Sequence, residues 1–381
     1  MAVSEKTEMG RARLSFAKES DIDEFVDVLD RFERGAITPD QWRSFRLLRG
    51  TYGQRQAEDA QMIRVKIPQG ALTGAQLDAL ADVAERYSRG FGHITTRQNV
   101  QFHFVKLHDV ERAMRRMAEA GMTTREACGN SVRNITCCPY AGVAADEVFD
   151  VTPYSEALTR YLLRHPLSSV LPRKFKIAFE GCPTDHIGTG INDIGFTARV
   201  RHDGTRERRG FGITVAGGTS TLARSGQVLF EFCPAEQICD AAEAIIRVYH
   251  RLGDYQHRQR NRLKFLVRSL GWDAFKAECE QEFARIRTEG GAAFPFDAEN
   301  PSVESEPAWP RPAAPSLDAV AARAQASVIR GPGIVPQVTP RLAVHSDEFL
   351  AWATTNVRAQ KQQGYAIVTV ATLLGDLTAA Q

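Results

Sequence analysis

The fold is decided by the stretch Met62-Ile-Arg-Val-Lys-Ile-Pro-Gln-Gly-Ala-Leu-Thr-Gly-Ala-Gln-Leu-Asp-Ala-Leu80. From Ile63 onward, apolar and basic side chains alternate, which predicts a β-strand that Pro68 and Gly70 end. Thr73 is a typical N-cap residue, and apolar residues then recur at helical spacing up to Tyr87. A strand that leads into an amphipathic helix is therefore the first predicted unit.

The residues on either side extend this unit. Downstream, 93–97 and 99–105 have the pattern of extended chain, and 109–120 has that of a helix. The order strand–helix–strand–helix is half of a ferredoxin-like unit, which we expect over residues 61–121. Upstream, residues 1–60 are charged and helix-prone, so we expect an N-terminal helical extension there.

Residues 122–290 mix short strands with glycine-rich connections and then become helical. Pro234 suits the first turn of a helix to about Leu252, and two further helices are expected at about 255–270 and 272–289. Six prolines follow within residues 291–316, which excludes a helix or a central strand. The predicted fold class is α+β, with a mixed-sheet lobe over 122–290 and a proline-rich linker over 291–345.

The end of the chain repeats part of its beginning. Gly375-Asp-Leu-Thr-Ala-Ala-Gln381 matches Gly70-Ala-Leu-Thr-Gly-Ala-Gln76 at five of seven positions. Chance or a general capping motif can produce such a match, and so can the start of a second copy. In the second interpretation, residues 346–381 begin a second, truncated ferredoxin-like half-domain, and the chain is the first half of an internal two-fold repeat.

Composition excludes several classes of protein. A formal net charge of +2 in 381 residues does not indicate a nucleic-acid binder, and the basic runs 199–209 and 257–264 are more typical of solvated faces. No apolar run reaches the roughly 20 residues of a membrane-spanning helix, and no signal peptide is recognisable. Seven cysteines in irregular spacing do not indicate a disulfide framework. We expect a cytoplasmic protein without a nucleic-acid or membrane partner.

Basic side chains on predicted strands are the candidate functional residues. Arg64 and Lys66 share one face of their strand, and Lys174 and Lys176 repeat the arrangement in Arg173-Lys-Phe-Lys176. Each pair is either the solvated face of a half-exposed strand or part of a pocket for an anion, since Lys and Arg on rigid strands neutralise carboxylates and oxyanions.

Thr95-Thr-Arg-Gln-Asn-Val-Gln101 is a dense polar cluster between apolar segments. It is either a loop that joins two strands or a set of donors for a polyanionic ligand, with Arg97, Gln98 and Gln101 as the donors.

Two segments place cysteines near other polar residues, namely Cys128–Cys138 and Glu180–His186. A zinc or cluster site needs four ligands in workable spacing. Adjacent Cys137 and Cys138 cannot easily bind one metal together, and Cys182 is followed by His186 rather than by another cysteine. We therefore expect buried structural thiols and no complete metal site.

Taken in order, five segments resemble the sulfite and nitrite reductase haemoprotein family, and the similarity runs from about residue 40 to the end. These segments are Met62–Pro68, Thr95–Gln101, Cys128–Asn134, Leu171–Lys176 and Ile191–Phe196. The resemblance implies six-electron reduction of an inorganic oxyanion, sulfite or nitrite, at a sirohaem coupled to a [4Fe–4S] cluster. It also implies a flavoprotein subunit or a ferredoxin as electron donor, and it makes residues 122–290 a sirohaem-binding lobe.

The resemblance assigns roles by position. Arg64, Arg133, Lys174 and Lys176 correspond to the catalytic cations around the substrate. The implied contacts to the carboxylates of the macrocycle are Arg97, Gln98, Gln101, Arg173 and Asn134.

The same resemblance leaves the substrate and the activity of this chain open. The Lys-x-Lys spacing favours an assimilatory sulfite reductase over an assimilatory nitrite reductase, and a non-catalytic fragment that binds an anion or a tetrapyrrole is the third interpretation. In the family, four cysteines arranged as C-x5-C and then C-x3-C hold the cluster, and this sequence contains no such pair of motifs. We expect the cluster ligands to be absent and this polypeptide alone to be inactive.

Overall fold

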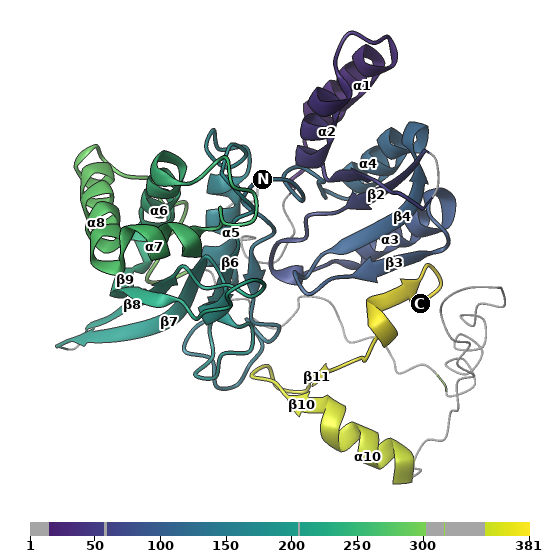
Figure 1. Ribbon diagram of the computed structural model, residues 1–381. Helices are drawn as coiled ribbons and strands as arrows, with labels where there is room; N and C mark the ends of the chain where they lie inside the picture. The colour runs from purple at the N-terminus through teal and green to yellow at the C-terminus, as the bar shows by residue number, and fades with distance from the viewer. Residues whose placement is uncertain (1–14, 57–58, 205, 302–315, 317–346) are drawn as a thin grey trace, which may run out of the picture.

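The computed structural model describes residues 15–56, 59–204, 206–301, 316 and 347–381, and Figure 1 shows their arrangement. These residues form two five-stranded sheets and a short C-terminal hairpin, with helices packed on the sheets. The α+β fold class is therefore confirmed. Most of the expected linker, residues 302–315 and 317–345, lies outside the described residues.

The first sheet is antiparallel, in the order β1-β2-β4-β3-β12. Its strands are β1 (Thr51–Gly53), β2 (Ala60–Arg64), β3 (Phe91–Ile94), β4 (Val100–Lys106) and β12 (Asp376–Thr378). Its helices are α3 (Gly74–Tyr87) and α4 (Val110–Glu119), and α1 (Glu19–Glu33) and α2 (Pro39–Leu48) adjoin it. This is the expected ferredoxin-like half-domain, with β1 added from the range expected to be an extension.

The turn that the sequence repeats is also repeated in the backbone. Thr73 and Gln76 form a reciprocal capping box at the start of α3, and Thr378 and Gln381 make the same two hydrogen bonds. Before each pair lies a short 3-10 turn, η2 (Pro68–Gly70) and η6 (Leu373–Gly375), that ends in a glycine with a positive φ of 74° or 82°. Residues 375–381 therefore match residues 70–76 in backbone conformation as well as in sequence.

The second sheet has the order β5-β6-β7-β8-β9 and is mixed, as expected. Strands β5, β6 and β7 are parallel, and β7, β8 and β9 are antiparallel. Its strands are β5 (Thr136–Cys137), β6 (Ile177–Glu180), β7 (Ile194–Asp203), β8 (Arg206–Val215) and β9 (Gln227–Pro234). Its helices are α5 (Thr152–Leu162), α6 (Ile238–Leu252), α7 (Leu263–Leu270) and α8 (Trp272–Thr288).

The prediction of a helix at 255–270 was wrong for the first half of this range, because α7 begins only at Leu263. The carboxylate of Asp254 accepts hydrogen bonds from the backbone N–H groups of Gln256 and His257 at 2.8 and 3.0 Å. Such local bonds close a turn and compete with helix formation. The preceding helix, expected to start at Pro234, begins with the short 3-10 turn η5 (Ala235–Gln237) and continues as α6.

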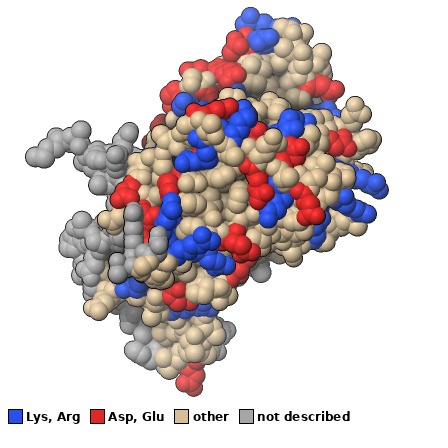
Figure 2. Space-filling model, turned by 90° about the vertical axis from the view of Figure 1, so that its left-hand side faces the viewer, with Lys and Arg blue, Asp and Glu red and all other residues tan. Residues whose placement is uncertain are grey.

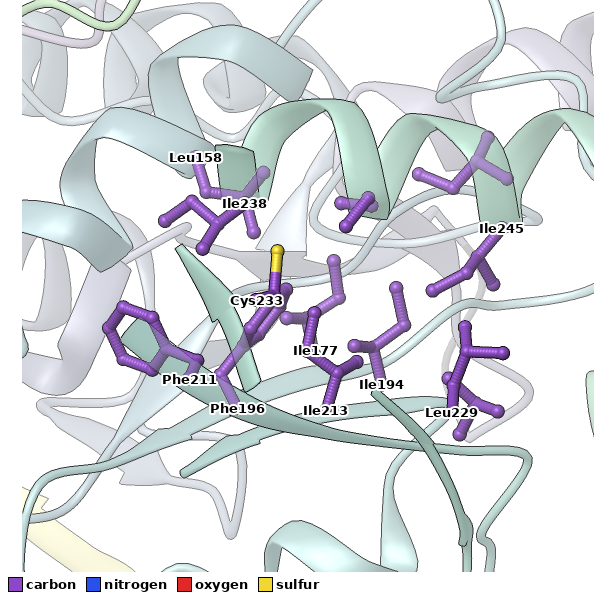
Figure 3. Close-up of a cluster of buried hydrophobic side chains, with 14 of the residues drawn as sticks. Leu158, Ile177, Ile194, Phe196, Phe211, Ile213, Leu229, Cys233, Ile238 and Ile245 are labelled. Atoms are coloured by element: carbon purple, nitrogen blue, oxygen red, sulfur yellow. The ribbon is translucent and has the colours of Figure 1, made fainter. Parts of the chain in front are cut away.

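The main core lies between the second sheet and α6 (Figure 3). Alternate residues of the strands face this helix, so Ile177, Ile194 and Phe211 are all fully buried. Phe211 packs edge-on against the stacked pair of Phe179 and Phe196, whose ring centroids are 4.5 Å apart. Aromatic contacts of this kind stabilise a core beyond the burial of apolar area alone.

The C-terminal segment contains α10 (Asp347–Asn356), β10 (Val357–Ala359) and β11 (Ala366–Val368), and it contacts both sheets. Lys361 donates its backbone N–H to the carbonyl of Val143 in the second lobe, while β12 pairs with β3 in the first sheet. Among the described residues, none of the helices combines the length and the apolarity needed to cross a bilayer.

Phe211→Ala should lower the free energy of unfolding by about 3–5 kcal/mol, because it leaves a cavity among four aromatic rings. Urea denaturation followed by circular dichroism measures the loss. Leu77→Ala on α3 is the matched control, since Leu77 is 54% exposed and should change stability by no more than about 0.5 kcal/mol. A Phe211→Ala loss no larger than that of the control would contradict this account of the core.

Candidate functional site

The structure brings the four candidate catalytic cations to the junction of the two sheets. Arg64 ends β2 of the first sheet. In the second lobe, Arg133 donates its backbone N–H to the carbonyl of Phe175 at 2.8 Å, so the segment before β5 runs beside the segment before β6. Phe175 is buried in the core, whereas Lys174 and Lys176 on either side of it are only half-buried. The alternation seen in the sequence therefore separates a core face from a cationic face.

These cations lie close enough to perturb one another. Burial and the charges of Arg97, Arg262 and Lys174 lower the pKa of Lys176 to about 8. Burial, followed by the charges of Arg133, Arg262, Arg173 and Arg64, lowers the pKa of Lys174. We call Arg64, Arg133, Arg173, Lys174 and Lys176 the cation cluster.

The cation cluster has few acidic partners. Neither the Lys174 nor the Lys176 ammonium group makes a hydrogen bond or an ion pair with any residue that the structure describes. The buried carboxylate of Asp193 accepts the backbone N–H of Lys176 and pairs with Arg262 at 2.7 Å. Desolvated cations without partners are unfavourable, so this cluster would be stabilised by an anionic ligand.

The surplus of positive charge is a local feature. The formal net charge of the whole chain is only +2. Figure 2 shows one face of the molecule on which acidic and basic side chains are interspersed. On the surface, Arg208 of the basic run 199–209 pairs with Glu236 at 2.9 Å. None of the five residues of the cation cluster forms an ion pair with an acidic side chain in the described part of the chain.

Two residues of the cluster have protein partners already. The guanidinium of Arg133 donates to the carbonyls of Ala127 and Gly129 at 3.0 and 3.2 Å. Gln101 lies opposite Arg64 across β2 and β4, and its amide oxygen accepts from Arg64 Nε at 2.9 Å in the amide orientation that satisfies both side chains. These contacts orient both arginines.

Three of the residues predicted to contact the macrocycle instead join the two sheets. Arg97 donates to the carbonyls of Asn134 and Ile177 at 2.5 and 2.9 Å. Gln98 exchanges two hydrogen bonds with the backbone of Cys137, at 2.7 and 3.0 Å. The Asn134 amide donates to the carbonyls of Ile67 and Arg97. Their roles toward a cofactor stay predictions. Of the polar atoms of these three side chains, Arg97 Nε and Asn134 Oδ1 are buried without a partner among the described residues.

Lys66 is more deeply buried than Arg64, while Val65 between them packs in the core of the first sheet, as the alternation predicts. Strand β2 ends at Arg64, and Lys66 is 3% exposed, with its ammonium group 3.8 Å from the buried carboxylate of Glu126. The Lys66 ammonium group also donates to the carbonyl of Val132 at 3.3 Å. Both partners lie about 60 positions away in the chain, so local alternation alone could not reveal them.

A cavity of about 680 Å³ is lined by Arg262, whose charge helps to lower the pKa of Lys176, but by no residue of the cation cluster itself. His257, Arg260 and Arg268 also line it, together with apolar side chains such as Tyr249 and Leu252. The run 257–264 was interpreted from the sequence as a solvated face, but part of it lines this cavity. The sequence signal that could have shown this is the apolar Leu263 within the basic run, a residue that the structure buries fully.

Two segments, the loop after β5 and the end of β6 with the loop that follows it, also meet in space, which sequence spacing did not predict. All seven cysteines are buried and unpaired, as expected for structural thiols. However, ligand atoms of Cys138, Glu180, Cys182 and His186 all lie within 4.8 Å of one another, the one such group of metal-ligating residues found in the described part of the chain. We call these four residues the Cys–His group.

Comparisons with known proteins agree with this geometry. A sequence profile described as "Nitrite/Sulfite reductase ferredoxin-like half domain" matches residues 52–120. A second one, described as "Nitrite and sulphite reductase 4Fe-4S domain", matches residues 128–286. The first match covers the first sheet except β12 and the first residue of β1, and the second covers the cation cluster in the second lobe.

Individual relatives divide between two substrates. The chain is 37% identical over 227 residues to a ferredoxin–nitrite reductase of Leptolyngbya laminosa, covering 58% of this chain and 44% of that protein. It is 32% identical over 232 residues to sulfite reductase [ferredoxin] 1 of Mycolicibacterium paratuberculosis, covering 61% of this chain and 41% of that protein. The chain thus spans less than half the length of these curated relatives.

A solved structure, that of the Mycobacterium tuberculosis NirA protein, has a similar fold. The TM-score is 0.62 at 28% sequence identity, and the similarity covers 73% of this chain and 54% of NirA.

Lys176 should destabilise the unliganded chain. Its pKa of about 8 lies below the ordinary value of 10.5, so between these pH values the unfolded chain binds more protons than the folded chain. The contribution of Lys176 should therefore make the melting temperature rise from pH 8 to pH 10.5. Lys176→Met should reduce that rise and should raise the melting temperature at pH 7. Lys276→Met on the surface of α8 is the control. An identical pH dependence in both variants would contradict the prediction.

Proposed function

This chain belongs to the family of nitrite and sulfite reductases, and on that premise we propose that it is the N-terminal part of an assimilatory sulfite reductase that uses sirohaem. The observation that carries the proposal is the cation cluster, whose Lys174 and Lys176 have no acidic partner among the described residues. A site with an uncompensated positive charge at a sheet junction suits an anionic cofactor and an anionic substrate.

The donors that line the junction fit a tetrapyrrole rich in carboxylates. The half-buried Arg173 and Lys174 can neutralise carboxylates. The cavity of about 680 Å³ has Arg260, Arg262 and Asp254 among its lining residues, and Arg262 is already paired with the buried Asp193. Arg97 and Asn134 each keep one buried polar atom without a partner at the junction. When bound, sirohaem would supply an iron that holds the oxyanion and delivers electrons to it.

The residues of this chain would bind the substrate and supply protons. Arg64 and Arg133, oriented by their own hydrogen bonds, would hold an oxyanion by charge. Lys176, with a pKa of about 8, is mostly protonated at neutral pH and can release that proton from Nζ to an oxygen atom of the substrate. Charge stabilisation by such donors often contributes the largest share of catalysis.

A [4Fe–4S] cluster with four thiolate ligands does not fit the residues present. All seven cysteines are described, and only Cys138 and Cys182 belong to a group of potential metal ligands there. Counting the C-x5-C and C-x3-C spacings from these two cysteines leads to Ala144 and His186. We therefore assign no electron transfer to a cluster in this chain, and residues 1–381 alone should be inactive.

Sulfite is the preferred substrate and nitrite the second candidate. Two neighbouring ammonium groups, Lys174 and Lys176, compensate a doubly charged anion better than a singly charged one. The observation in favour of nitrite is the 37% identity to a ferredoxin–nitrite reductase. The names of both relatives favour ferredoxin over a flavoprotein subunit as electron donor. A cytoplasmic location is part of the same proposal.

Residues 1–381, produced in cells that make sirohaem, should bind the tetrapyrrole without reducing sulfite or nitrite. The absorption spectrum of the purified protein measures binding, and a viologen-coupled assay measures reduction. The double variant Lys174→Met, Lys176→Met should lose at least half of the bound tetrapyrrole, whereas Lys276→Met should keep it. No tetrapyrrole in the wild-type protein would contradict the proposed site, and turnover by this chain alone would contradict the argument about the cluster.

Substrate preference can be tested in a longer protein, made by including any coding sequence that follows residue 381. The test requires that this longer protein reduces sulfite or nitrite. Lys176→Asn should lower kcat/KM for sulfite by about 100-fold or more and should lower that for nitrite less. Lys176→Arg keeps the charge and should retain most activity toward sulfite. Equal losses for the two anions would show that Lys176 does not distinguish them.

A further inference from the structure

The Cys–His group lies where two neighbouring parallel strands end. Cys137 of β5 pairs with Phe179 of β6, so the next residue, Cys138, lies beside Glu180, the last residue of β6. Because parallel strands have their carboxyl ends at the same edge of a sheet, the loops that follow them meet there. Cys138 therefore faces Cys182 across that edge although 44 positions separate them in the chain.

The loop after β6 is wrapped around the Glu180 carboxylate. One oxygen of this carboxylate accepts the backbone N–H of Cys182 at 2.8 Å, and the other accepts that of His186 at 2.7 Å. The same loop is held on its far side by Asp185, which accepts the N–H and the hydroxyl of Thr189, both at 2.8 Å. The positions of Cys182 and His186 are thus set by hydrogen bonds that do not involve their own side chains.

Three of the six distances within the group are close to those of a tetrahedral metal site, and all six lie within 4.8 Å. Zinc bonds of about 2.3 Å to sulfur and about 2.0–2.1 Å to nitrogen place two sulfur ligands about 3.8 Å apart, and a sulfur and a nitrogen ligand about 3.6 Å apart. Cys138 Sγ lies 3.8 Å from Cys182 Sγ and 3.5 Å from His186 Nδ1. Glu180 Oε1 lies 3.8 Å from the same Nδ1, a few tenths of an ångström longer than ideal.

The surroundings suit a bound cation. Cys138, Glu180 and Cys182 are almost fully buried, at 2%, 0% and 1% exposure, while His186 is open to solvent and leaves a path for an ion. The backbone N–H of Tyr140 donates to Cys138 Sγ at 3.4 Å, a contact that favours a thiolate. The Tyr140 ring packs edge-on against the His186 ring, with centroids 5.1 Å apart, and orients it.

We propose that Cys138, Cys182, His186 and Glu180 bind a single zinc ion. Two thiolates, one imidazole and one carboxylate are a donor set that zinc accepts in tetrahedral geometry. Ala144, which packs against both cysteines, offers no ligand atom, so a four-thiolate cluster is excluded at this position. The ion is assigned independently of the reductase activity proposed above.

The ion would join the loop after β5 to the loop after β6. The first of these loops also receives the C-terminal segment, through the Lys361 N–H on the Val143 carbonyl at 3.0 Å and the Gln362 amide on the Gly142 carbonyl at 3.0 Å. On its other side, Cys137 is held by Gln98 of the first sheet. Zinc at this point would therefore stabilise the edge at which the lobe, the first sheet and the C-terminal segment meet.

The test titrates cobalt(II), and then zinc, into residues 1–381 purified under reducing conditions and freed of metal. We expect one cobalt per chain, with the visible absorption of tetrahedral coordination and a thiolate charge-transfer band that zinc abolishes. Cys138→Ser and Cys182→Ser should weaken binding by more than the roughly 10–100-fold that outer partners of metal ligands contribute. His186→Cys should retain binding, and Cys279→Ala, a buried thiol of α8, should bind like the wild type.

His186→Ala keeps the experiment decisive if a buried serine prevents folding. Because His186 is exposed, its removal leaves no buried cavity, and the loss of this ligand should still weaken metal binding. The proposal is overturned if the wild-type chain takes up neither metal, or if uptake is unchanged in Cys138→Ser, Cys182→Ser and His186→Ala. It is equally overturned if these residues take up iron together with sulfide. A disulfide between Cys138 and Cys182 that persists in reductant with zinc present would also refute it.

Discussion

The hydrogen bonds between the Thr95–Asn99 loop and the backbone around β5 are the constraint on which the rest of this protein depends. Gln98 makes a two-bond pair with Cys137, and Arg97 and Asn134 bond to main-chain carbonyls on opposite sides of the junction. Buried bonds of charged or amide groups to carbonyls are costly to leave unmade, so they hold the two sheets in one relative position. That position brings Arg64 of the first sheet next to Arg133, Lys174 and Lys176 of the second.

The cation cluster illustrates a conflict between stability and binding. Burial lowers the pKa of Lys174 and Lys176, which means that the folded chain bears these charges at a cost. The same charges would be favourable beside an anionic macrocycle and an oxyanion, because each ligand supplies the missing counter-charge. A core of stacked and edge-on aromatic rings under the second sheet supplies rigidity that such a site requires.

The second lobe thus uses its sheet in two ways. The segments that enter β5 and β6 carry the cation cluster apart from Arg64, and the Cys–His group lies at the ends of the same strands and in the loops that leave them. Because β5 and β6 are parallel, entering segments share one edge of the sheet and leaving loops share the opposite edge. The proposed anion site and the proposed zinc site therefore lie at opposite ends of these two short strands.

The sequence by itself determined the features that depend on neighbours in the chain. Alternation around Phe175 separated the buried aromatic residue from Lys174 and Lys176, and the Thr73 capping box marked the start of α3, because strand and helix periods are local properties. Only the tertiary structure decided that Lys66 faces Glu126, that Gln98 holds Cys137 and that Cys138 meets Cys182 and His186. Each of these contacts joins residues brought together by strand pairing and loop closure over dozens of positions, and no local period records such distances.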